Sequence, residues 1–99
     1  MVKLVVAYGA PEDSAAFDAH YASTHVPLVE KIPNLRRFEA GKILGTPDGS
    51  AAPFYWLAEL WFDSVEEIQA GMGSSEGQAA GADVPTFASG GATLMIAEA

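Results

Sequence analysis

Apolar residues recur with two different spacings along the chain, and the order of these stretches predicts the fold. Spacings of three and four precede Pro33 and follow Ser64, which is typical of helices. Four other stretches are rich in apolar, β-branched and aromatic residues and are typical of strands: residues 2–8, 35–45, 53–62 and 92–98. The resulting order, β-α-β-β-α-β, predicts an α+β, ferredoxin-like domain with a four-stranded antiparallel sheet.

Capping residues and helix breakers define the predicted helices. Asp13 or Ser14 can cap a first helix that runs to about Ile32, where a Pro-Asn step ends it. The segment 64–67, Ser-Val-Glu-Glu, matches a capping box at the start of the second helix. Three glycines weaken that second helix, so we expect it to break near Gly73 and to be followed by a second short helix.

The predicted third strand, 53–62, is largely apolar on both faces. One face carries Phe54, Trp56, Ala58, Leu60 and Phe62, and the other carries Tyr55, Leu57, Glu59 and Trp61. Because two helices cover only one face of a four-stranded sheet, the second face would remain an exposed apolar patch. A second copy packed against it would cover that patch, which predicts a homodimer through the sheet faces. The alternative is that residues 74–91 fold across this face.

The amino-acid composition excludes several classes of function. The 99 residues, 49% of them apolar, are expected to form one domain over 1–99. The net charge of −8 disfavours nucleic acid and anionic membranes as partners, because both require clustered Lys and Arg. Without cysteine, a Walker A loop or a G-x-S-x-G elbow, thiol, nucleotide-hydrolysing and Ser-hydrolase chemistry are excluded. No apolar run reaches the roughly 20 residues of a membrane span, so we expect a cytoplasmic protein.

Both histidines fall in the predicted first helix. At about 100° per residue, His20 and His25 lie on opposite shoulders of its apolar stripe. Pro27 has no N–H, so the Ser23 carbonyl loses its helical partner and the helix bends. The bend leaves a gap beside His25 in which a small polar ligand group can bind.

The motifs of this chain resemble a known family. They are Phe17-Asp18-Ala19-His20-Tyr21, His25-Val26-Pro27-Leu28, Asn34-Leu35-Arg36-Arg37, Trp61-Phe62-Asp63-Ser64, Ser75-Glu76-Gly77, Asp83 and Phe87. In this order they resemble the EthD family over essentially the whole chain. The resemblance implies a dimeric α+β barrel, in which two ferredoxin-like protomers pack their sheets face to face. It also implies a link to ethyl tert-butyl ether degradation, where the prototype is an auxiliary protein beside a monooxygenase system; related barrels include cofactor-independent monooxygenases and lactone isomerases.

The first helix supplies three candidate site residues. His25, with an ordinary pKa near 6.5, is the candidate general acid or base; alternatively it is a structural histidine that bonds the freed Ser23 carbonyl. Tyr21 is either a core residue whose hydroxyl reaches a polar partner or a substrate contact. His20 is either a surface histidine or a substrate contact. The five-residue spacing of the histidines does not match a helical zinc pair, so we expect no metal; a haem would need one of them as its axial ligand.

The other candidates lie on the third strand and behind the second helix. Tyr55, Glu59 and Trp61 share a predicted face and could line the inner wall of a barrel. A buried Glu59 would have a raised pKa and could exchange a proton with substrate. The alternative is an ion pair with Lys42 or Arg37 on the neighbouring strand.

Asp83 follows the glycine-interrupted helix, where a loop or N-cap role is expected. The family resemblance adds it to the substrate-binding candidates. Two functional hypotheses remain. The first is an enzyme without a cofactor that isomerises, dehydrates or oxygenates a small apolar molecule, with His25 moving the proton. The second, which the sequence favours because it places no second polar group, is an accessory protein that binds such a molecule or docks on an oxygenase system.

Overall fold

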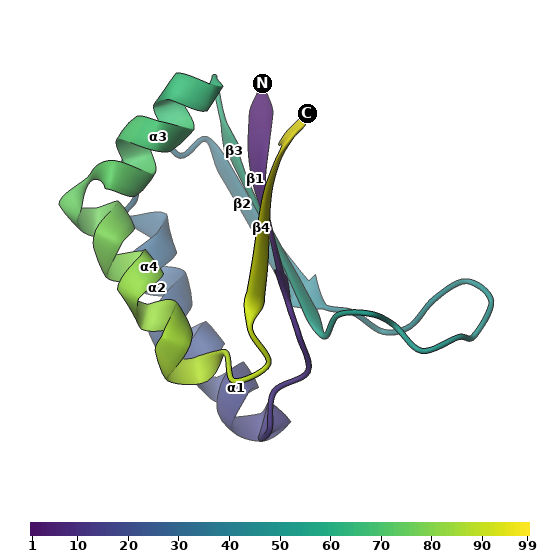
Figure 1. Cartoon of the computed structure of the whole chain (residues 1–99). Coiled ribbons are helices and arrows are strands. Elements are labelled where there is room, and N and C mark those ends of the chain that lie inside the picture. The colour runs from purple at the N-terminus through teal and green to yellow at the C-terminus, as the bar shows by residue number, and fades with distance from the viewer.

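The computed structural model describes all 99 residues and places one layer of helices against one sheet (Figure 1). The sheet is antiparallel with the strand order β2-β3-β1-β4. The strands are β1 (Val2–Tyr8), β2 (Arg37–Lys42), β3 (Trp56–Phe62) and β4 (Ala92–Glu98). This arrangement confirms the predicted α+β, ferredoxin-like fold.

The two most apolar strands, β1 and β3, lie at the centre of the sheet because their alternate residues fill the core. Leu4 is paired with Leu60, and Val6 with Ala58, and all four side chains are buried under the helices. The edge strands β2 and β4 are more exposed. Period-two alternation therefore determines which side of the sheet receives the helices.

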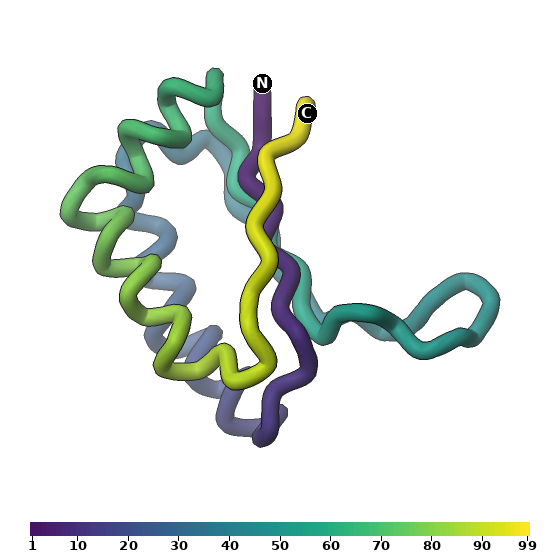
Figure 2. Tube along the Cα trace, in the orientation of Figure 1, coloured from purple at the N-terminus to yellow at the C-terminus, as the bar shows by residue number.

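The connection between β2 and β3 is longer than the sequence predicted. A last backbone hydrogen bond joins the Ile43 N–H to the Tyr55 carbonyl, and residues 44–54 beyond it leave the sheet as an arm that projects from the body of the molecule (Figure 2). At the tip of the arm, Asp48 accepts hydrogen bonds from the Ser50 backbone N–H and hydroxyl and from the Thr46 hydroxyl. Gly49 follows with a φ of 81°. These turn residues and the nearby prolines end the strand pairing earlier than the apolar pattern suggested.

The helices are α1 (Ser14–His20), a π-helical segment η1 (Tyr21–His25), α2 (Val26–Glu30), α3 (Val65–Gly73) and α4 (Ser75–Phe87). Asp13 caps α1, and Ser64 caps α3, each by accepting a backbone N–H from the first turn. The predicted break near Gly73 is confirmed. Ser74 ends α3, and its hydroxyl accepts the Gly77 N–H at the start of α4. With 13 residues, α4 is longer than the short helix expected.

All the helices cover the same face of the sheet (Figure 1). Phe87, at the end of α4, packs against Tyr8 of β1 and Phe17 of α1, with ring centroids 5.7 and 5.1 Å apart. The alternative in which residues 74–91 cross the opposite face is therefore wrong. None of the helices combines the length and the apolar character that spanning a membrane requires.

The opposite face, called the open face here, carries no helix. Trp61 lies there between the Lys3 ammonium, 5.5 Å from its ring centroid, and the Arg37 guanidinium, at 4.8 Å. Lys3 also forms an ion pair with Glu59 at 2.7 Å. Glu59 is thus paired, as one alternative had it, but the predicted partners Lys42 and Arg37 are wrong because β1 supplies the cation.

Candidate functional site

The first helical rod contains a π-helical turn at η1. Pro27 has no N–H with which to continue the α-helical ladder, and the Val26 N–H bonds the Tyr21 carbonyl, five residues back. This spacing widens the turn, so residues five apart come to the same side of the rod. His20 and His25 consequently meet the same neighbour, and the prediction that they lie on opposite shoulders is wrong.

That neighbour is Asp83 on α4. Its Oδ2 lies 3.0 Å from Nδ1 of His25, and its two carboxylate oxygens lie 2.9 and 3.0 Å from Nε2 of His20. The Thr86 hydroxyl donates to Oδ1 at 3.1 Å. The expectation of a loop or N-cap role for Asp83 is wrong, because α4 continues past it to Phe87. His25 likewise bonds this carboxylate and not the carbonyl freed by the proline.

Burial and hydrogen bonding shift the pKa values of His25 and Asp83. The His25 side chain is 4% exposed and that of His20 is 31% exposed. Burial lowers the pKa of His25, and the hydrogen bond to Asp83 offsets that change only in part. Burial alone would raise the pKa of Asp83, but the hydrogen bonds from both histidines and from Thr86 outweigh it and lower that pKa. An ionised Asp83 therefore holds the His25 proton on Nδ1 and leaves a lone pair on Nε2, which no residue bonds.

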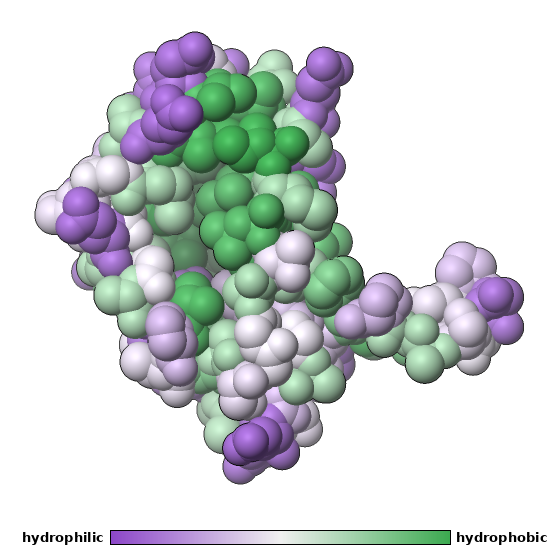
Figure 3. All heavy atoms as spheres, in the orientation of Figure 1, coloured by the Kyte–Doolittle hydropathy of each residue, from purple (hydrophilic) through white to green (hydrophobic).

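His25 lines a cavity of about 60 Å³ between the helices and the sheet. Its walls are mostly apolar, with Leu60 and Val84 among them, and no charged side chain lines it. Tyr8 and Tyr21 supply the remaining polar groups. In Figure 3, apolar surface gathers along β4 and around the hollow between this strand and the helices. A mostly apolar hollow with a few polar groups has the character of a ligand site, but about 60 Å³ leaves room for a molecule, or the end of one, of only a few heavy atoms.

One group of donors in the core lacks partners. The Tyr21 hydroxyl and Nε1 of Trp56 are both buried without a hydrogen bond, and the two rings lie 4.9 Å apart. The Tyr21 hydroxyl therefore makes no hydrogen bond of good geometry, although Trp56 and Tyr8 lie close enough to act on its pKa. Burial raises the pKa of Tyr21 to about 12. Burial, and after it the neighbouring Tyr21, raise the pKa of Tyr8. Both hydroxyls therefore stay protonated at neutral pH.

The structure separates the predicted site residues into two groups. His25 and Tyr21 line the cavity, with Asp83 and His20 directly behind His25. Glu59 and Trp61 belong to the open face, on the other side of the sheet. The cavity and the open face therefore do not form one site within a single chain.

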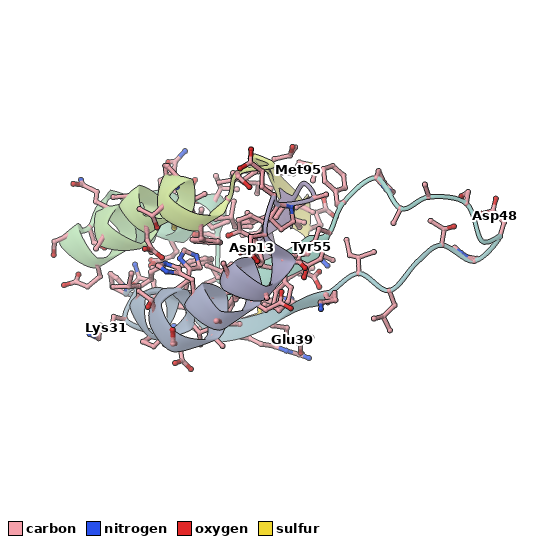
Figure 4. All side chains as sticks on the ribbon, turned by 90° about the horizontal axis from the view of Figure 1, so that it is seen from below. Asp13, Lys31, Glu39, Asp48, Tyr55 and Met95 are labelled. Atoms are coloured by element: carbon pink, nitrogen blue, oxygen red, sulfur yellow. The ribbon has the colours of Figure 1, made fainter.

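Tyr55 belongs to neither group, so its predicted place on the open face is wrong. Its ring packs 5.3 Å from that of Phe17, and its hydroxyl donates to Asp18 at 2.6 Å. Lys42 holds the same carboxylate at 2.9 Å. Because β3 begins at Trp56, the alternation does not extend to Tyr55. Figure 4 shows Tyr55 at the base of the arm that carries Asp48 at its tip.

Of the fourteen residues that line the cavity, sequence reasoning predicted only Tyr21 and His25 as site residues; Tyr8 and Gly81 are among those it missed. The alternation of β1 was a signal for Tyr8, since it places this residue on the same face as Leu4 and Val6. Gly81 gave no comparable signal, because its part depends on how α4 packs. No three His, Cys, Asp or Glu side chains are placed to hold a metal ion.

Comparison with known proteins finds similarity to one protein family. A model described as the EthD domain matches residues 10–91 of the chain. An uncharacterized 11.0 kDa protein in the thcB-thcC intergenic region of Rhodococcus erythropolis is 47% identical over 98 residues, 99% of this chain and 94% of that protein. The crystal structure of an ethyl tert-butyl ether d (EthD) family protein from Bacillus halodurans is 45% identical, with a TM-score of 0.93, and the match covers 100% of this chain and 98% of that one.

Two more distant structures share the fold. A dimeric ferredoxin-like protein of unknown function from Thermobifida fusca is 13% identical, with a TM-score of 0.75 over 99% of this chain and 90% of that one. A variant of SnoaB, a cofactor-independent oxygenase from Streptomyces nogalater, is 12% identical, with a TM-score of 0.67 over 99% of this chain and 91% of that one. At these identities the likeness concerns the fold alone.

Proposed function

The chain belongs to the EthD domain family, and on that premise we propose that it binds a small apolar organic molecule in its cavity, where His25 transfers a proton. The observation that carries this proposal is the hydrogen bond between His25 and Asp83 at the wall of an uncharged cavity. Asp83 is the second polar group that sequence reasoning could not place. Its presence favours acid–base chemistry over binding alone.

The geometry supports the following step. Nε2 of His25, which has a lone pair and no partner, takes a proton from the bound molecule, and the resulting imidazolium is stabilised by the ionised Asp83. His25 then returns the proton to another atom of the same molecule. The net result is an isomerisation, or a dehydration if a hydroxide leaves with the returned proton. This chemistry requires no cofactor.

We further propose that two copies pack through their open faces and that the protein works on an ether or a related compound beside an oxygenase system. Support for the pairing comes from the uncovered Leu57 and Trp61 and from the dimeric description of the Thermobifida fusca protein. Support for an ether as substrate comes from the family description of the Bacillus halodurans protein, which names ethyl tert-butyl ether, whereas the oxygenase system is only what the EthD resemblance implies. The SnoaB description supports chemistry without a cofactor on this fold.

Exchange of carbon-bound hydrogen tests the proton transfer. Acetone, a ketone of only four heavy atoms and so matched to a cavity of about 60 Å³, is incubated with the protein in D₂O, and exchange beside its carbonyl is followed by NMR. His25→Gln should slow the protein-dependent exchange by about 10²–10⁴-fold. The control Glu30→Gln, on the exposed side of the same rod, should leave the rate unchanged. Because only neutral His25 accepts the proton, the rate should rise with pH through its lowered pKa and then level off.

A second candidate function is binding without chemistry. It is favoured by one observation: the polar side chains of the lining are His25 and two tyrosines, and only histidine ordinarily exchanges a proton near neutral pH. In that case acetone would shift the NMR signals of the His25 ring while its exchange stayed at the buffer rate. This result would remove the catalytic part of the proposal and keep the binding part.

A further inference from the structure

We propose that the arm of one copy, residues 44–54, lies along β4 of a second copy and covers Leu94 at the mouth of that copy's cavity. A segment of the partner chain would then complete each cavity. The inference rests on the proposed pairing through the open faces and deepens it, because it names the part of the partner that reaches the site.

The arm has few backbone hydrogen bonds of its own. At its base the Ile43 N–H bonds the Tyr55 carbonyl, and at its tip the Gly49 N–H bonds the Thr46 carbonyl. No backbone hydrogen bond joins the two legs between these points. Leu44, on the first leg, is 94% exposed. The arm therefore has free backbone groups and a leucine with which to bind the edge of another sheet.

The arm projects on the side of the sheet that carries no helix, where the second copy of the proposed dimer lies (Figure 1). Residues 44–48 lead from its base to its tip, and five extended residues span at most about 18 Å. Sheets that pack face to face lie about 10 Å apart. The arm is therefore long enough to pass the edge of the partner's sheet.

The edge strand β4 has an apolar surface that the helices leave uncovered (Figure 3). Leu94 and Ile96 lie on its helix side, since Val6, the partner of Leu94 on β1, is buried there. They nevertheless remain 56% and 49% exposed. The arm of the same chain does not cover them, because it leaves on the opposite side of the sheet (Figure 1). Leu94 also lines the cavity, so a segment that covers this residue covers the mouth.

Two-fold symmetry allows two arrangements of the facing sheets. An axis parallel to the strands places β2 of one copy opposite β4 of the other, whereas an axis across the strands places β2 opposite β2. The long exposed side chains of β2 are charged. On β4, by contrast, three consecutive apolar side chains are exposed, Leu94, Met95 and Ile96. An apolar contact for Leu44 is therefore available at β4, which favours the parallel axis.

The level at which the arm leaves the sheet agrees with this arrangement. Lys42, Trp56, Tyr8 and Ala92 form one row across the four strands. An axis parallel to the strands keeps this level, so the arm, which follows β2, passes the partner near Ala92. Leu94 is two residues further along β4.

Cross-linking between introduced cysteines tests the contact, because the chain itself has no cysteine. Ala51→Cys, on the arm, and Leu94→Cys are placed in two chains, one of which is tagged, and these are co-expressed and treated with a short bis-maleimide. We expect the mixed dimer to be the main linked product on a denaturing gel. In the matched control, Arg37→Cys, exposed on β2, takes the place of Leu94→Cys, and no mixed dimer should form.

Leu44→Asp tests the arm without cross-linking. It should raise the dissociation constant of the dimer by about 10-fold or more in sedimentation equilibrium, because a carboxylate would replace an apolar contact with the partner. Unfolding of dilute protein should not change, since Leu44 makes little contact within its own chain. The control Val65→Asp, an exposed apolar residue at the start of α3, should leave the dissociation constant unchanged.

The outcomes separate this inference from the proposed function. A dimer in which Ala51→Cys links to Arg37→Cys or to neither position, or in which Leu44→Asp leaves the dissociation constant unchanged, would overturn the inference while the proposed pairing stands. A protein that stays monomeric at every concentration would overturn the proposed pairing as well. Because Leu44 and Ala51 are exposed in the single chain, neither substitution endangers the fold.

Discussion

The two faces of the sheet are built from alternate residues of the same strands, yet they differ in what they do with polar groups. On the helix side, Leu60 and its neighbours are buried, and the polar contact at the cavity wall is that of His25 with Asp83. On the open face, Lys3 and Glu59 pair while each stays about a quarter exposed. The buried hydrogen bond sets the tautomer of His25 and acts on its pKa. The partly exposed ion pair of Lys3 and Glu59 has little such effect, because water screens it.

This difference assigns different tasks to the two faces. The helix side has the enclosed, low-dielectric surroundings in which a single histidine can act as a base. The open face has a tryptophan, Trp61, between two cations, with apolar neighbours that remain in contact with water. Its composition suits contact with a second copy of the chain. Each prediction below tests one side of this comparison.

The largest effect is expected from two leucines of β3 that face opposite ways. Leu60→Ala, on the helix side, should reduce the free energy of unfolding by about 2–5 kcal/mol, because a fully buried side chain leaves a cavity. Leu57→Ala, on the open face, should cost less than about 1 kcal/mol in dilute solution, where the copies are apart. Urea denaturation measures both.

Leu57→Ala should act instead on self-association, which sedimentation equilibrium measures. Its dissociation constant should rise by about 10-fold or more if Leu57 lies in the dimer interface. Equal losses of stability for the two leucines would mean that the faces are not distinct. An unchanged dissociation constant would remove the open face as the interface.

Two glycines of α4 test how tightly the helix side is packed. A Cβ atom at Gly77 would lie within 2.2 Å of the Gly71 carbonyl oxygen, so Gly77→Ala should destabilise the protein by about 1–3 kcal/mol. At Gly81 nothing lies within 4 Å, and Gly81→Ala should stabilise the helix by up to about 1 kcal/mol. Thermal unfolding compares them. A stability loss for Gly77→Ala together with a gain for Gly81→Ala would support close packing of α4 that is interrupted at the cavity. Changes of the same sign for both variants would contradict it.

Local patterns were sufficient for the fold and insufficient for the site. Alternation in the strands, the Ser64 cap and the break at Gly73 each depend on neighbouring residues, so the sequence predicted them correctly. The contact of Asp83 with both histidines joins residues 58 and 63 positions apart. No periodicity encodes such a distance.

The error at the histidines has one physical source. A rotation of about 100° per residue holds for an α-helix, but η1 is a π-helix. The sequence shows that Pro27 interrupts the backbone hydrogen bonds of the helix, but it does not show that a π-helical turn replaces them. The error at Tyr55 is similar, since the alternation was extended beyond Trp56, where β3 begins. In both cases the prediction extended a regular helix or strand beyond the residue at which that element ends.

The buried histidine predicts that the stability of the protein depends on pH. Burial lowers the pKa of His25 in the folded state below the value near 6.5 of an unfolded histidine. The unfolded chain therefore binds the proton more readily, and the free energy of unfolding should fall as the pH drops below about 6.5 towards the folded pKa. His25→Gln should remove this part of the slope in urea titrations between pH 5 and 8. Leu57→Ala, which keeps both histidines, should retain it; a slope unchanged in His25→Gln would contradict the assignment.

The smallest effect is expected from the open-face ion pair. Glu59→Gln should cost less than about 1 kcal/mol in dilute protein, because Lys3 and Glu59 are both partly solvated. In 1 M salt, where screening acts over about 3 Å, most of this difference should disappear. At protein concentrations that favour the dimer, the same substitution should cost more and respond less to salt, because the second copy would exclude water from the pair. Urea titrations at two protein and two salt concentrations separate these regimes. A large effect insensitive to salt in dilute protein would show that the pair is desolvated within a single chain, and the contrast between the two faces would not hold.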